Sequence, residues 1–141
     1  MLYMLDTNVL SEHMKGNPKI ARRGNDIEPG DAIAVSNIAW FEIIRGRIAA
    51  LTTADDMNQL LIAQMRLNQD LEKLERLKVY GVTESVAAHF DSLRANKKCK
   101  KMDRPDLLIA CITLANNATL VTRNVKDFSN IPSLKIQNWF N

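Results

Sequence analysis

The sequence lacks the residues that build cross-linked or zinc-stabilised folds. It has only two cysteines, Cys99 and Cys111, and two histidines among 141 residues. The cysteines have neither zinc-ligand spacing nor enough partners for a disulfide framework. Such usage is typical of a protein of the reducing cytoplasm. Cys111 lies in an apolar run and is expected in the core, whereas Cys99 lies among lysines and is expected at the surface.

Long apolar runs are also missing. No run approaches the roughly 20 residues of a membrane-spanning helix, and no basic region followed by a long apolar stretch marks a signal peptide. The net charge of +3 is a mild basic bias, compatible with a polyanionic partner but too weak to establish one. Apolar residues make up 46% and charged residues 25%, as in ordinary globular proteins. We therefore expect one cytoplasmic domain spanning residues 1–141.

What the sequence does contain is an alternation of short apolar runs and helix-like segments. The runs expected to form strands are residues 2–5, 32–35, 79–82, 120–122 and 134–136. Helices are expected over residues 9–15, from 37 to about 46, within 53–77, from 83 to about 95 and from 107 to about 116, with a turn at 19–23 and a loop at 24–31. This alternation predicts right-handed crossovers and a parallel sheet between helices. The expected fold class is a three-layer α/β/α fold with about five short strands.

Acidic residues occur where such a sheet builds its sites. Asp6 follows the first strand, Glu42 lies in the helix after the second, and Asp106 opens the helix that leads to the fourth. Since the carboxyl ends of parallel strands share one edge, these acids could converge there. Each also has a structural explanation. Asp6 or Thr7 could cap the next helix, Glu42 could face solvent, and Asp106 would be favoured by the helix dipole.

A convergence of carboxylates would have a chemical consequence. Clustered negative charges repel one another unless a divalent cation holds them together. Hard oxygen ligands without a neighbouring histidine or cysteine favour Mg²⁺ or Mn²⁺ over zinc. Neither His13 nor His89 stands beside these acids in the sequence. The residues therefore predict a Mg²⁺ or Mn²⁺ site rather than a zinc site.

Four stretches carry a family resemblance. They are Leu5-Asp6-Thr7-Asn8, Glu42-Ile43-Ile44-Arg45-Gly46, Asp106-Leu107-Leu108-Ile109-Ala110 and Leu120-Val121-Thr122-Arg123-Asn124-Val125-Lys126-Asp127-Phe128. In order and spacing they resemble the four motifs of the PIN-domain family, with the closest likeness to the VapC-type toxins of prokaryotic toxin–antitoxin modules. The ending from Ile131 to Trp139 is similar to the usual ending of those toxins, so the likeness spans the chain.

The resemblance implies a PIN-like fold and a divalent-metal-dependent endoribonuclease. Such a protein cleaves RNA phosphodiester bonds, acts as a toxin, is inhibited by a cognate antitoxin and forms a homodimer. Asp6, Glu42 and Asp106 match the three central acids of the family. The fourth position is open, because many relatives have an acid where this chain has Asn124 and a further acid where it has Asp127.

The expected roles follow from this match. Asp6, Glu42, Asp106 and Asp127 are the expected catalytic residues. Asp6, Asp106 and Asp127 would bind the metal, with Glu42 binding it directly or through water. The expected supporting residues are Thr7, Thr122 and Asn124.

Basic residues are the expected contacts to the RNA backbone. We assign Arg45, Arg104 and Arg123 to this role. Relatives often have glycine-rich sequence before Asp106, where this chain has four lysines within residues 97–101. That run is either a solvated loop or a phosphate-contacting patch. Asn124 leaves an alternative function open, namely a PIN-like module that binds nucleic acid or protein with weak catalysis.

Overall fold

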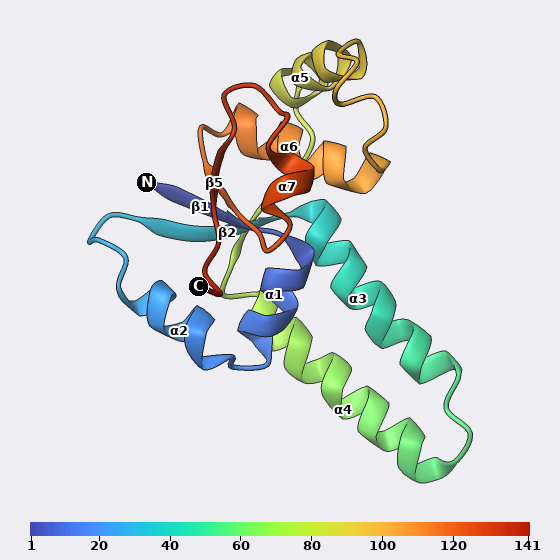
Figure 1. Cartoon of the computed structure of the whole chain (residues 1–141). Coiled ribbons are helices and arrows are strands. Elements are labelled where there is room, and N and C mark those ends of the chain that lie inside the picture. The colour runs from blue at the N-terminus through green and yellow to red at the C-terminus, as the bar shows by residue number, and fades with distance from the viewer.

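The computed structural model describes all 141 residues and contains one sheet and seven helices (Figure 1). The strands are β1 (Leu2–Leu5), β2 (Ala32–Ser36), β3 (Lys78–Tyr80), β4 (Thr119–Val121) and β5 (Lys135–Gln137). All neighbouring strands are parallel, in the order β3-β2-β1-β4-β5. The predicted parallel sheet of five short strands is confirmed, and β1 lies at its centre.

The helices connect these strands and cover both faces of the sheet. They are α1 (Thr7–Met14), α2 (Pro18–Asn25), α3 (Asn37–Thr52), α4 (Met57–Leu74), α5 (Glu84–Arg94), α6 (Arg104–Ala115) and α7 (Val125–Phe128). Side-chain hydroxyls cap the amino ends of α3 and α5. The Ser36 hydroxyl accepts from the Ala39 N–H at 3.0 Å, and the Thr83 hydroxyl from the Val86 N–H at 3.3 Å. No helix is long and apolar enough to span a membrane.

Alternation along the strands divides the core into two halves. On one face, Met4, Ala34 and Leu120 belong to a cluster that includes side chains of α5, α6 and α7. On the other face, their neighbours Leu5, Val35 and Val121 pack with α1, α2, α3, α4 and Trp139. Because both faces are covered, the strands need apolar residues at successive positions, which explains the unbroken run in β1. The three-layer α/β/α prediction is confirmed.

Two helices, α2 and α3, extend beyond the sequence prediction. The expected turn at 19–23 is helix α2, which Asn17 caps and Pro18 begins. The helix expected to close near Gly46 continues to Thr52 as α3. Glycine costs a helix interior about 1 kcal/mol, and packing against α4 offsets that cost. The two helices form the hairpin that extends to the lower right in Figure 1.

One ion pair with a buried carboxylate joins the two helices of that hairpin. The Arg47 guanidinium of α3 forms an ion pair with the carboxylate of Asp70 on α4, and Asp70 is buried. A buried carboxylate needs such a partner because its desolvation is costly. The pair therefore sets the position of α4 along the half of α3 that follows Glu42.

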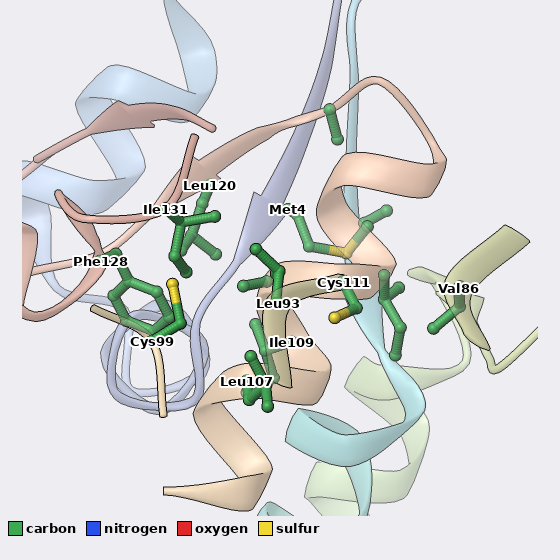
Figure 2. Packing of buried hydrophobic residues seen from close by; sticks show 14 residues of the cluster. Met4, Val86, Leu93, Cys99, Leu107, Ile109, Cys111, Leu120, Phe128 and Ile131 are labelled. Atoms are coloured by element: carbon green, nitrogen blue, oxygen red, sulfur yellow. The ribbon is translucent and has the colours of Figure 1, made fainter. Parts of the chain in front are cut away.

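The prediction for Cys99 is wrong. Its side chain is fully buried, and it packs in the same cluster as Phe128 and Ile131 (Figure 2). Its thiol lies 3.9 Å from the carbonyl oxygen of Asn130. Burial raises the pKa of the thiol. The lysine run is therefore anchored at its centre to the segment after α7. Cys111 is buried, as predicted.

Candidate functional site

Asp6 lies at the carboxyl end of the central strand and is held there by three hydrogen bonds. Its N–H donates to the carbonyl oxygen of Val121 at 2.9 Å. One carboxylate oxygen accepts from the Thr7 N–H and the other from the Thr122 hydroxyl, both at 2.8 Å. The side chain is buried, with 4% exposure. Asp6 thus caps α1, as the structural alternative proposed, and also fixes a carboxylate at the sheet edge.

The two threonines extend this network to other segments. The Thr7 hydroxyl donates to a carboxylate oxygen of Glu42 at 3.3 Å, which joins α1 to α3. The Thr122 hydroxyl also accepts from the backbone N–H of Asn124 at 3.0 Å. Glu42 and Asn124 are exposed, and the Asn124 side chain forms no hydrogen bond. The structure therefore links Asp6 to Glu42 through Thr7, and to the loop after β4 through Thr122.

The pKa of Asp106 responds to its burial and to the charges of the other acids. It lies half-buried in the first turn of α6. Burial raises its pKa to about 6, and the negative charges of Asp6, Asp103, Glu42 and Asp127 act in the same direction. Carboxylates from distant parts of the sequence thus lie close enough to repel the charge of Asp106. The acids expected to form the site gather at this edge of the sheet.

Asp127 takes no part in the hydrogen-bond network around Asp6. It is exposed in α7, a four-residue helix that the sequence prediction did not include. Asp127, Asp106 and Asp103 line one cleft of about 520 Å³. The exposed Asn124 does not line this cleft. Asp103 begins α6 as its N-cap residue without a side-chain capping bond.

The acidic side chains at this edge of the sheet are chemically suited to bind a hard divalent cation. All of these side chains offer carboxylate oxygen, which Mg²⁺ and Mn²⁺ prefer. A cation would also relieve the repulsion that raises the pKa of Asp106. In the present side-chain arrangement, no three acidic, histidine or cysteine side chains could hold one ion. Binding therefore requires rotation of side chains, and the exposed side chain of Asp127 forms no hydrogen bond or ion pair that would oppose its rotation.

Two of the arginines expected to bind RNA lie over aromatic rings. The Arg104 guanidinium lies 5.3 Å from the centre of the Phe90 ring, and the Arg123 guanidinium lies 3.7 Å from that of Phe140. Arg45 is exposed on α3 and forms no ion pair. A guanidinium over a ring keeps donors along its edge, so this position is compatible with a phosphate contact.

The cleft beside Asp106 is also lined by three lysines, Lys98, Lys101 and Lys126. Sequence reasoning considered the lysine run as a whole and did not single out Lys126. The only signal for Lys126 was its position next to Asp127. Which lysines of the run line the cleft depends on the burial of Cys99, a residue expected from the sequence to lie at the surface.

Comparisons with known proteins agree with the fold. The family model described as PIN domain matches residues 3–134. Ribonuclease VapC1 of Haemophilus influenzae is 35% identical over 144 residues, which cover 99% of this chain and 98% of the relative.

Two solved structures extend the likeness to three dimensions. That of VapBC-1 from nontypeable Haemophilus influenzae has a TM-score of 0.79, 29% identity and full coverage of both chains. That of VapBC2 from Rickettsia felis bound to a fragment of promoter DNA has a TM-score of 0.79, 29% identity and 99% coverage of both chains. The similarity runs from end to end in sequence and in fold. The chain therefore belongs to the PIN-domain family and, within it, to the VapC ribonucleases.

Proposed function

We propose that this chain is a divalent-metal-dependent endoribonuclease and the toxin of a VapBC-type toxin–antitoxin module. The observation that carries the proposal is the gathering of Asp6, Glu42, Asp106 and Asp127 around one edge of the sheet, where their charges act on Asp106. The substrate is RNA, and the bond that is hydrolysed is a phosphodiester. A cognate antitoxin holds the enzyme inactive, and the VapBC structures among the relatives support this partner. We further propose one PIN domain, a homodimer and a cytoplasmic location.

The acidic residues are the proposed ligands of the metal ion. Asp6, Asp106 and Asp127 are the proposed ligands of Mg²⁺ or Mn²⁺, with Glu42 as a direct or water-mediated ligand. A bound ion would lower the pKa of a water molecule and neutralise charge on the reacting phosphate. Asp6 is already fixed by Thr7 and Thr122 and therefore needs little reorganisation.

The exposed side chains of Glu42 and Asn124 can position the attacking water molecule. Glu42 accepts a hydrogen bond from the Thr7 hydroxyl, which restricts the directions in which its carboxylate can point. A carboxylate at this position, outside the direct coordination of an ion, can orient a water molecule or accept its proton. Asn124 can orient a water molecule through its carboxamide but supplies no charge.

Purified protein free of antitoxin should cut RNA in Mg²⁺ and in Mn²⁺, and it should lose this activity in EDTA. The reason is that clustered carboxylates hold phosphodiesters poorly without a cation between them. The measurement is cleavage of a panel of structured and single-stranded RNAs beside single-stranded DNA of matched sequence. RNA that stays intact with every metal, or cleavage that persists in EDTA, would contradict the proposal.

The alternative is a PIN-like module that binds nucleic acid or protein with weak catalysis. One observation favours it: no three of the acids stand ready to hold an ion, and Asn124 supplies no charge. Under this alternative, the same panel shows RNA binding in gel shifts without products at any metal concentration. The absence of cleavage products from RNA that is bound therefore separates the two functions.

Asp127→Asn should weaken the dependence on Mg²⁺ and the rate of cleavage by about ten-fold or more, a loss common around metals. Asp127 lines the cleft with Asp106 and carries a charge that Asn124 lacks. Asn124→Asp should be tolerated or should tighten metal binding, because it restores a carboxylate. The measurement is cleavage rate against Mg²⁺ concentration for both variants. Wild-type behaviour of Asp127→Asn together with loss of cutting in Asn124→Ala would assign the fourth position to Asn124.

A further inference from the structure

The lysine run does not present its charges uniformly. Lys98 and Lys101 line the cleft of about 520 Å³ beside Asp106, whereas Lys97 and Lys100 do not. All four side chains are exposed. Lys98 and Lys101, which are three residues apart, therefore lie on the cleft, whereas Lys97 and Lys100, also three residues apart, do not line it.

Cys99 fixes this division. Its buried side chain occupies the space beside Phe128 and Ile131 (Figure 2), so the backbone of the loop cannot rotate to exchange one pair of lysines for the other. Hydrogen bonds hold the turn on both sides of the cysteine. The Lys98 N–H donates to the side-chain oxygen of Asn96 at 2.9 Å, and the Met102 N–H donates to the Cys99 carbonyl at 3.1 Å.

A second segment of the chain adds a third cation to the cleft. Lys126 belongs to α7, and Asn130 follows that helix. The Cys99 thiol lies 3.9 Å from the Asn130 carbonyl, which keeps the lysine loop and the α7 segment together. Lys98, Lys101 and Lys126 thus reach the same space from two segments far apart in the sequence.

These three ammonium groups have no protein partner. The ion pairs of the structure lie elsewhere, at Asp31, Glu12 and Asp70. The cleft has one hydrophobic lining residue, Met102, among nine. Protein partners usually anchor on buried apolar or aromatic pockets, and this cleft offers none. Free cations on a polar, open surface suit a solvated polyanion instead.

We propose that Lys98, Lys101 and Lys126 form a phosphate-binding subsite that holds the RNA backbone beside the scissile phosphodiester, while Lys97 and Lys100 take no part in it. The subsite rests on the proposed ribonuclease function and specifies where the substrate strand leaves the acids. Its volume lies within the range of about 300–1,000 Å³ that is usual for small-ligand sites. A short segment of a nucleotide strand can therefore enter it.

The test compares two double variants that remove the same charge from the same loop. Lys98→Gln/Lys101→Gln and Lys97→Gln/Lys100→Gln are each built on Asp6→Asn, so that RNA is not consumed. Binding of a fluorescently labelled single-stranded RNA is measured with Mg²⁺ at several salt concentrations. Loss of two phosphate contacts should make the negative slope of log K against log salt concentration shallower by about 1.4, where K is the association constant for RNA. It should also weaken binding roughly 20-fold near 0.1 M salt.

The Lys97→Gln/Lys100→Gln control should change affinity less than about two-fold, because long-range attraction is screened within about 10 Å at this salt. Lys98→Arg/Lys101→Arg should retain binding, and Lys126→Gln should lower the slope by about 0.7. Thermal melts of each variant check that the fold is intact. Equal losses in the two double variants would overturn the subsite in favour of diffuse charge.

A parallel assay of RNA cleavage by the wild-type chain separates this inference from the proposed function. Cleavage by the wild type with no binding difference between the double variants overturns the subsite and leaves the enzyme. If Lys98→Gln/Lys101→Gln weakens RNA binding and the wild-type chain does not cleave RNA, the subsite is supported and the proposed ribonuclease function is rejected. RNA binding that is unchanged while the antitoxin complex is weakened would assign the cleft to the protein partner and overturn the proposal.

Discussion

Asp6→Asn should lower RNA cleavage by more than the roughly 100-fold loss seen for outer partners of metal sites. The buried carboxylate accepts from the Thr7 N–H on one oxygen and from the Thr122 hydroxyl on the other. An asparagine supplies one oxygen and one NH₂ group, so only one of these two positions keeps an acceptor. It also removes the charge that a hard cation needs most at the centre of the site.

The same variant gives a readout in cells. The wild-type chain expressed alone should arrest bacterial growth, and Asp6→Asn should not. Co-expression with the neighbouring reading frame that encodes the antitoxin should relieve the arrest and yield a complex on purification. Asp55→Asn is a matched control, because Asp55 is an exposed acid between α3 and α4. Equal toxicity of Asp6→Asn would show that nuclease chemistry at this site is not the cause.

Folding must be checked beside activity, since the substitution disturbs buried hydrogen bonds. Leaving one buried polar partner unsatisfied costs about 1–3 kcal/mol. A melting temperature that falls by a few degrees, with the native circular dichroism spectrum retained, keeps the result interpretable. Thr122→Ser, which retains a hydroxyl at the position bonded to Asp6, should keep most of the activity.

The sheet could be predicted from the sequence because its signal is local. An unbroken apolar run such as Leu2–Leu5 identifies a strand that is covered on both faces, and polar residues such as Asp6 identify its end. Helix lengths were predicted less well. The continuation of α3 past Gly46 depends on packing against α4 and on the Arg47–Asp70 pair, neither of which is visible in the local pattern.

The site was predicted in its members but not in its connections. The motif order points to the acids, yet the hydrogen bond from Thr122 to Asp6 joins residues 116 positions apart. Cys99 illustrates the limit most clearly. Surrounded by lysines, it resembles a surface residue, but a loop has no fixed period, and contact with Phe128 decides which side chain turns inward. The division of the lysines into two pairs follows from that tertiary contact.

Asp106→Asn should combine loss of cleavage with a gain in stability of the metal-free protein. Cleavage should fall by more than about 100-fold, as for Asp6→Asn, because a charged ligand is lost. The gain in stability comes from the environment of the carboxylate. Burial, together with the charges of Asp6 and three other acids, raises the pKa of Asp106 from 3.8 to about 6 in the folded chain.

The sign of the pH dependence follows from that shift. Between the two pKa values the folded chain keeps a proton that the unfolded chain has released, so stability falls as the pH rises. The stabilisation is complete below pH 3.8 and is lost as the pH passes through about 6. Because the side chain is only half-buried, solvent screening reduces the full linkage value, and about 1–1.5 kcal/mol remains.

The melting temperature of Asp106→Asn in EDTA should therefore exceed that of the wild type at pH values near 8, and the difference should shrink as the pH approaches 4. A shift of about 1 kcal/mol corresponds to roughly 2–8 °C for domains of about this size. Mg²⁺ should stabilise the wild type, since an ion that binds only the folded state adds its binding free energy. It should stabilise the variant much less. If the variant is less stable than the wild type at every pH, favourable contacts stabilise the Asp106 carboxylate. That outcome would contradict the description of this site as a cluster of mutually repelling carboxylates that binds a cation.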